Sequence, residues 1–303
     1  VICADTLVLK DAPHAMTAAG YGDLAAKLIA GSDWIISNAI TGEPIDPVAW
    51  DLVQTGLRDC VSLSGRLNEG EAIEAIFSGL AMTGFAMQIT KSSRPVSGAE
   101  HLFSHIWEME NLEKDGIPVY HGAKVALGTV ASACFTEEVF KRSPGDIDIE
   151  KRLAHWPSWE ERESEVRDAF SNIPQAVPQL IEINKAKYKT KEEIKNHYRT
   201  AVEIWEELKT RVQRQLIPSN ELFSRFAEAE CPTNPTEINL TSERFFQTFR
   251  RAQMLRNRFT VLDLAFELGI LEECIEAVKA SGRFAIENDS GKRTSSGPAI
   301  QRE

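Results

Sequence analysis

The chain has 303 residues, of which 43% are hydrophobic and 26% are charged, as in a typical globular protein with one large or two smaller domains. These proportions exclude collagen-like, fully disordered and disulfide-scaffold proteins. The formal net charge of −11 argues against a general nucleic-acid-binding protein, because contact with phosphates requires a basic face.

The first half of the sequence predicts one short strand followed by helices. Residues 1–9 are rich in branched side chains and are expected to form an edge strand. The spacing of apolar residues and the helix-start signals then predict helices over 22–38, 47–67, 69–89, 97–113 and 119–141. The most apolar range, 69–89, is expected to be a central buried helix whose Gly79 and Gly84 allow close packing.

The composition changes near residue 141. The segment 141–240 is heavily charged and predicts helices over 150–170 and 189–216, the second with one apolar stripe. Further helices are expected over 241–256 and 262–281. The polar residues 285–303 are expected to form a disordered tail. Taken together, the pattern predicts an all-α protein.

The cysteines and the apolar segments indicate the compartment. The five cysteines are far apart and include no CxxC pair, which predicts reduced thiols and a cytoplasmic location. The longest apolar run, 75–89, is too short and too interrupted for a membrane span, and residues 1–15 carry no secretory signal pattern. Because the chain starts with Val, it is expected to be processed or a fragment.

Three of the six histidines fall within 21 positions of the predicted helical core. His101 and His105 are four residues apart and share a helix face, and His121 starts the next predicted helix. Antiparallel helices joined by a short turn would bring His101 and His121 together as ligands for a divalent metal. Asp23 is one of several carboxylates that could complete such a site, and N-terminal capping of a helix is its alternative role.

The segment before His101 has the composition of an anion site. Arg94 lies in a small, polar loop that contains Gly98 and opens a helix, where backbone N–H groups and a guanidinium can converge. A surface arginine in a loop is the alternative interpretation. Glu100 and Glu108 flank the histidines, where each either orients an imidazole or lies on a polar face.

Four segments in combination resemble a known family. They are residues 16–24 (MTAAGYGDL), 92–105 (SSRPVSGAEHLFSH), 121–125 (HGAKV) and 255–260 (LRNRFT). Their order and content resemble the sn-glycerol-1-phosphate dehydrogenases, including the bacterial arabinose-operon-type branch. These belong to the wider group of dehydroquinate synthase-like and iron-containing alcohol dehydrogenases. The resemblance covers residues 1 to about 130 and 245–265, whereas 141–240 matches poorly and is expected to be an insertion.

The resemblance implies one half of a two-domain fold. Family members have an N-terminal α/β domain that binds NAD(P) through a Gly-rich loop and a helical C-terminal domain that carries the metal. This chain has no such loop after a strand, so the resemblance implies the C-terminal portion, with the α/β nucleotide-binding domain largely absent. Residues 1–12 would be a remnant of that domain, and 13–284 would form the helical metal and substrate domain.

The resemblance also implies roles for individual residues. Asp23, His101 and His121 match the metal ligands of the family, with zinc or nickel as the ion. His105 matches a histidine linked to phosphate or proton handling, and Arg94 matches a residue that contacts the substrate phosphate. Further candidates for the phosphate or the site wall are Lys124, Arg256 and Arg258.

The implied reaction is the reversible reduction of dihydroxyacetone phosphate to sn-glycerol 1-phosphate. The metal would act as a Lewis acid at the ketone oxygen, NAD(P)H would supply the hydride, and His105 would relay a proton. The expected partners are therefore a small phosphorylated substrate and further copies of the chain. Three alternatives remain: a glycerol or other alcohol dehydrogenase, a dehydroquinate synthase-like carbocycle-forming enzyme, and a non-enzymatic helical interaction protein.

Overall fold

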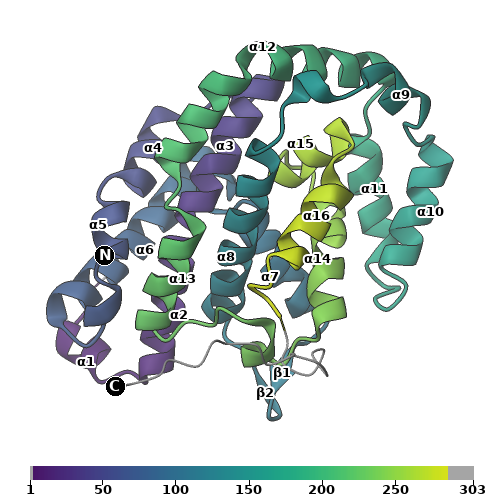
Figure 1. Ribbon diagram of the computed structural model, residues 1–303. Helices are drawn as coiled ribbons and strands as arrows, with labels where there is room; N and C mark the ends of the chain where they lie inside the picture. The colour runs from purple at the N-terminus through teal and green to yellow at the C-terminus, as the bar shows by residue number, and fades with distance from the viewer. Residues whose placement is uncertain (1–2, 286–303) are drawn as a thin grey trace, which may run out of the picture.

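Almost every element of the protein is a helix, as the computed structural model shows for residues 3–285 (Figure 1). In the labels used below, α marks α-helices, η marks 3-10 helices and β marks strands. The elements before residue 120 are α1 (Thr6–Lys10), α2 (His14–Ala25), α3 (Lys27–Thr41), α4 (Pro47–Gln54), α5 (Leu57–Val61), η1 (Ser64–Arg66), α6 (Gly70–Thr90), η2 (Arg94–Val96), α7 (Ala99–Met109), β1 (Glu113–Lys114) and β2 (Ile117–Pro118). The later elements are α8 (His121–Phe140), η3 (Pro144–Asp146), α9 (Ile149–Ala154), α10 (Trp159–Ala169), α11 (Val177–Lys187), α12 (Lys191–Gln215), α13 (Ser219–Glu228), η4 (Pro235–Ile238), α14 (Ser242–Leu255), α15 (Val261–Leu268) and α16 (Leu271–Ala280). The prediction of a mostly helical protein is confirmed, and the short antiparallel β1–β2 ribbon is the part of it that the sequence did not indicate.

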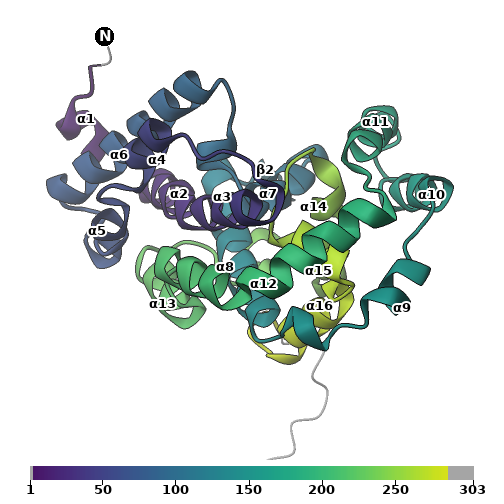
Figure 2. The ribbon, with the colours of Figure 1, turned by 90° about the horizontal axis from the view of Figure 1, so that it is seen from above.

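Helix α8 forms the centre of the core. It packs against α7, α2, α13 and α16, and Figure 2 shows it surrounded by these elements. Most of its side chains are buried, including Leu127, Val130 and Phe135, each with no exposed surface. The central, buried helix of the protein is therefore α8, and not the helix over 69–89 for which the sequence predicted this position.

Helix α6 lies at the edge of the molecule instead. It packs against α4, α2 and α1, while Phe85, Met87 and Ile89 near its C-terminal end remain 41%, 36% and 46% exposed. The predicted close packing holds at Gly79, whose position faces Leu24, but Gly84 faces open space. The sequence analysis judged the apolar run 75–89 too short for a membrane span, but the helix that contains it is longer than this run. By length and composition alone the 21-residue α6 could cross a bilayer, although its packing makes it part of the fold.

The predicted edge strand over residues 1–9 is wrong for the residues that the structure describes. Thr6–Lys10 is a short helix, because the Asp5 side chain caps it by accepting a hydrogen bond of 2.9 Å from the Leu7 amide. Leu7 and Val8 remain largely exposed. The tail predicted as disordered lies, from residue 286 on, outside the described residues.

The helix boundaries differ from the predicted ones at several places, two of them at glycines. The range predicted as 47–67 is divided at Gly56, and the range 262–281 is divided at Gly269, both in left-handed conformation with φ of 74° and 77°. The helix predicted over 22–38 is two helices and begins at His14. Helices α11 and α13 lie in ranges for which the sequence analysis predicted no helix.

The charged segment 141–240 covers one side of the helical core. Helix α12 lies along α3 (Figures 1 and 2). Trp205, Leu208 and Val212 of its predicted apolar stripe are buried. Helices α10 and α11 lie side by side at the outer edge. The segment is therefore an integral part of the fold, which accounts for the amphipathic pattern of α12.

Helices α2 and α8 cross in backbone contact. A Cβ atom built on Gly122 would overlap the carbonyl oxygen of Ala19, and one built on Gly22 would lie 2.8 Å from both the Cβ of Ala126 and the Gly122 oxygen. Only hydrogen fits at these two positions. The crossing places the last turn of α2 beside the first turn of α8.

Substitution of Gly122 is expected to separate these two helices. Gly122→Ala should lower the free energy of unfolding by about 3 kcal/mol, because the added methyl meets backbone that cannot turn away. The matched control is Gly84→Ala, also within a helix but facing open space, which should stabilise the protein by about 0.5–1 kcal/mol. Chemical denaturation measures both values, and equal effects of the two substitutions would contradict the close crossing.

A buried carboxylate connects α7 to α14. Glu110 at the end of α7 accepts hydrogen bonds from Arg244 (2.8 Å), Arg251 and Asn172 (2.8 Å). Burial raises the pKa of Glu110, but these hydrogen bonds outweigh it and hold the pKa below its ordinary value. The carboxylate form therefore stabilises the folded protein.

The stability that Glu110 supplies is expected to depend on pH. Because its pKa is lower in the folded than in the unfolded protein, the contribution is present above the unfolded value near 4.5 and is lost as the pH falls through the folded value. Glu110→Gln should cost about 3 kcal/mol at pH 7, since Arg251 loses its charge partner. The stabilities of both proteins should converge as the pH falls below 4.5 and through the folded pKa of Glu110. A difference that does not depend on pH would contradict this account.

Candidate metal centre

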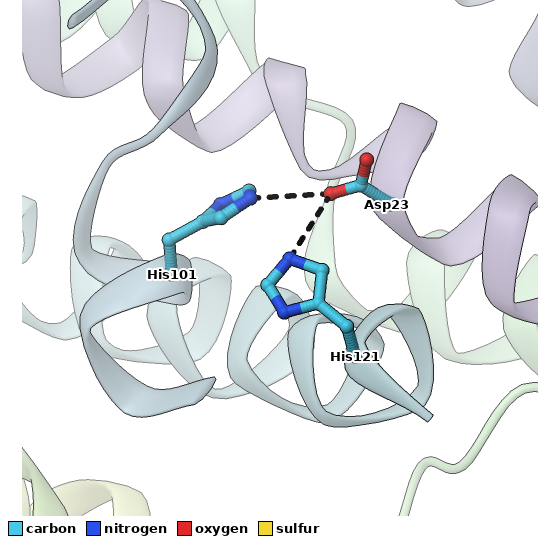
Figure 3. A group of neighbouring side chains, drawn as sticks. All are labelled: Asp23, His101 and His121. Carbon is cyan, nitrogen blue, oxygen red and sulfur yellow. Dashed lines mark ion pairs between the residues drawn. The ribbon is translucent and has the colours of Figure 1, made fainter. Parts of the chain in front are cut away.

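Three side chains with metal-ligand chemistry point toward one another from three helices. Asp23 comes from α2, His101 from α7 and His121 from α8, and their ligand atoms all lie within 4.8 Å of one another (Figure 3). Asp23 Oδ1 is 3.1 Å from His101 Nε2 and 3.9 Å from His121 Nε2. The structure thus brings together the three residues that the sequence analysis assigned to a metal.

The chain reversal between α7 and α8 places the two histidines. The β1–β2 ribbon turns at Gly116, with φ of 76°, so that α8 returns along α7. His101 and His121 each lie in the first turn of their helix, and their ring centroids are 5.4 Å apart. His105 lies one turn after His101, with its ring centroid 6.2 Å from that of His121.

Asp23 lies near the C-terminal end of α2, not at a helix start. The capping role considered for it is therefore wrong. The run that precedes it looks like a loop because of Gly20 and Gly22, but the helix runs through both. Helix α2 needs Gly22 because α8 approaches it closely there.

A buried carboxylate holds the first histidine. Glu100 has no exposed surface, and its Oε1 accepts hydrogen bonds from His101 Nδ1 at 2.7 Å and from the Gly98 amide at 2.8 Å. With Nδ1 occupied, Nε2 is the nitrogen that faces Asp23. Of the two roles weighed for Glu100, orientation of an imidazole is the one that its contacts support.

A second carboxylate lies beside the other two histidines. Glu108 Oε1 is 2.6 Å from His121 Nδ1, and its Oε2 is 3.1 Å from His105 Nδ1. Lys124 Nζ is 3.4 Å from the same Oε1. Burial raises the pKa of Glu108, but the hydrogen bonds from His105 and His121 outweigh it and lower the pKa below its ordinary value.

Lys27 is a buried neighbour of the cluster that the sequence analysis missed. Its Nζ lies 3.0 Å from Asp23 Oδ1, and only 2% of the residue is exposed. Although burial raises the pKa of Asp23, the charge of Lys27 and a hydrogen bond from His101 hold it well below its ordinary range. The four-residue spacing of an acid and a base on adjoining helical turns was the available signal.

The three donors fit a divalent ion. Ligand atoms about 2.1 Å from a tetrahedral ion are about 3.4 Å apart, and the two separations from Asp23 Oδ1, 3.1 and 3.9 Å, lie on either side of that value. Two imidazoles and one carboxylate are a donor set that zinc and nickel accept. The side chain of His121 is 45% exposed, so the cluster opens to the surface.

The residues assigned to phosphate do not converge on this cluster. Arg94 is buried and donates to the carbonyl oxygens of Asp33 (3.0 Å) and Phe259 (2.9 Å). It lines a cavity of about 370 Å³ together with Arg258, whereas none of the three metal-ligand candidates lines that cavity. Of the phosphate candidates Arg94, Lys124 and Arg258, only Lys124 lies beside the histidines, through its contact with Glu108.

The fold and the cluster together define a class: a mostly helical protein with a three-donor candidate metal centre at a helix crossing. Comparison with known proteins shows which enzymes the chain is similar to. The chain is 41% identical over 173 residues to glycerol-1-phosphate dehydrogenase [NAD(P)+] of Bacillus velezensis, 34% over 154 residues to that of Bacillus licheniformis, and 38% over 129 residues to that of Bacillus subtilis. No family model matches the chain.

These relatives match the chain in part. The aligned stretches cover 56%, 50% and 42% of this chain and 41%, 38% and 33% of the three relatives. The chain therefore spans less than half the length of the curated relatives that it matches. Over that part it is homologous to the glycerol-1-phosphate dehydrogenases, as the sequence motifs predicted.

Metal binding is expected to depend on both histidines. The protein, loaded with zinc and then desalted, should retain about one ion per chain, and the double variant His101→Ala/His121→Ala should retain none. His155→Ala is the matched control, because His155 is exposed and lies in another part of the fold. Plasma mass spectrometry measures the ratio, and equal retention by the double variant would place the metal elsewhere.

Proposed function

We propose that this chain supplies the metal- and substrate-binding part of an NAD(P)-linked glycerol-1-phosphate dehydrogenase. The observation that carries the proposal is the convergence of Asp23, His101 and His121. The relatives, which are named for oxidation of glycerol 1-phosphate with NAD(P)+, support it. An oxidoreductase of this kind moves a hydride and a proton between an alcohol and its ketone.

In the oxidation direction, one hydride and one proton leave glycerol 1-phosphate. The C–H bond at carbon 2 of glycerol 1-phosphate breaks and its hydride reduces NAD(P)+, while the hydroxyl at the same carbon loses its proton, which leaves dihydroxyacetone phosphate. A divalent ion in the cluster would supply Lewis acidity at the substrate oxygen. The two Nε2 atoms and one carboxylate oxygen of the cluster would hold that ion.

The neighbouring residues are suited to the proton and to the charge. His105 Nδ1 is hydrogen-bonded to Glu108, so Nε2 is the nitrogen proposed to accept the substrate proton and to return it in reduction. Its side chain is 31% exposed, which leaves it accessible from the open side of the cluster. The carboxylates of Asp23, Glu100 and Glu108 would offset the charge that a divalent ion adds, whereas the ammonium of Lys27 is already paired with Asp23.

The substrate phosphate remains assigned by proposal to Arg94, Lys124 and Arg258. Their placement also favours one alternative. Because Arg94 and Arg258 line a separate cavity and Lys124 is already paired with Glu108, an unphosphorylated alcohol such as glycerol is the second candidate substrate. The names of the relatives favour the phosphorylated one.

The proposal also covers the fold group, the oligomeric state and the cellular location. We assign the helical fold to the dehydroquinate synthase-like group, residues 1–12 to the edge of a nucleotide-binding domain, and the active form to a homo-oligomer. A cytoplasmic location is consistent with five cysteines that form no disulfide.

A comparison of two substrates tests the function. The metal-loaded protein, in the longest form that its gene encodes, should form NAD(P)H with glycerol 1-phosphate, with kcat/KM on the order of 100-fold or more above that with glycerol. Absorbance of NADH or NADPH measures both rates. Equal kcat/KM values would support the unphosphorylated alcohol, and no NAD(P)H from either substrate would contradict the dehydrogenase proposal.

A further inference from the structure

The carboxylate of Glu108 contacts two imidazoles with its two different oxygens. Oε1 is 2.6 Å from Nδ1 of His121, and Oε2 is 3.1 Å from Nδ1 of His105. The Ser104 hydroxyl is 3.3 Å from Oε1 and also 3.3 Å from His121 Nδ1. One side chain therefore spans the candidate metal ligand and the candidate proton carrier.

This contact pattern decides which nitrogen of each ring carries hydrogen. A carboxylate offers acceptors only, so each Nδ1 must donate to Glu108. In a neutral imidazole the other nitrogen, Nε2, then has its lone pair free. For His121 that atom is the one 3.9 Å from Asp23 Oδ1.

We propose that Glu108 is a shared positioning residue, which holds His121 and His105 in the Nδ1–H form and fixes both rings through one carboxylate. The proposal rests on the proposed metal centre and goes beyond it, because it joins the metal ligand to the proton carrier. It assigns proton transfer at His105 to Nε2, since Nδ1 is occupied.

The geometry distinguishes this carboxylate from that of Glu100. Glu100 serves one ring, is fully buried and also accepts a hydrogen bond from the Gly98 amide, so its removal would disturb the backbone as well. The Glu108 side chain is 33% exposed and makes no contact with a backbone amide among the described residues. Removal of Glu108 should therefore change the rings without unfolding the helix.

Nuclear magnetic resonance of the metal-free protein tests the assignment directly. With ¹⁵N-labelled histidine at pH 8, long-range ¹H–¹⁵N correlation identifies the protonated nitrogen of each ring. In the unaltered protein both His105 and His121 should be Nδ1–H. In Glu108→Ala both should move toward Nε2–H, and in Glu108→Gln, whose amide has a single oxygen, one ring should keep the Nδ1–H form.

Zinc affinity is the second measurement, and Glu110→Ala is the matched control. Competition with a chelator should show zinc binding 10- to 100-fold weaker in Glu108→Ala. Glu110→Ala removes a carboxylate two residues away that touches no imidazole. It should lower the melting temperature while leaving the ring protonation and the zinc affinity unchanged.

The outcomes separate the two proposals. Unchanged ring protonation in Glu108→Ala, or unchanged zinc affinity in a protein that binds zinc, would overturn the positioning role. If the rings respond as expected but the unaltered protein binds no zinc, the orientation by Glu108 is supported and the metal centre is refuted.

Discussion

The close crossing of α2 and α8 is the constraint on which the candidate site depends. Backbone meets backbone at Gly22 and Gly122, where no side chain larger than hydrogen fits. Asp23 and His121 are the immediate neighbours of these glycines, so the contact that packs the helices also sets the distance between the two donors. A similar contact at Gly128, where a Cβ would overlap the Glu100 carbonyl oxygen, holds α8 against α7.

Charge balance is the second constraint, because the cluster concentrates ionised groups in a partly buried place. Burial and the Lys27 charge lower the pKa of His101, but its hydrogen bonds to Asp23 and Glu100 raise it on balance. Burial and then the charge of the nearby Glu100 raise the pKa of the buried Asp33 to about 7. Three carboxylates, those of Asp23, Glu100 and Glu108, therefore contact the histidines, and the ammonium of Lys27 offsets part of their negative charge.

The sequence indicates the local part of this arrangement and not the tertiary part. The four-residue spacing of His101 and His105 and the short turn before His121 are local, and helical geometry brings these rings together as expected. Asp23 was assigned to a helix start, because glycines that serve helix packing resemble loop glycines in a single sequence. Likewise, hydrophobicity alone does not reveal which apolar helix is central. The distance between Arg94 and the histidines is set by the packing of the loop on α3, which periodicity does not encode.

Anomalous diffraction at the zinc absorption edge, from crystals of the protein prepared with zinc, tests the central claim most directly. The account predicts one strong peak within about 2.0–2.2 Å of Asp23 and of the Nε2 atoms of His101 and His121. A zinc peak bound to other residues, or no peak in crystals that hold zinc in solution, would contradict the assignment of these helices to a metal-dependent dehydrogenase.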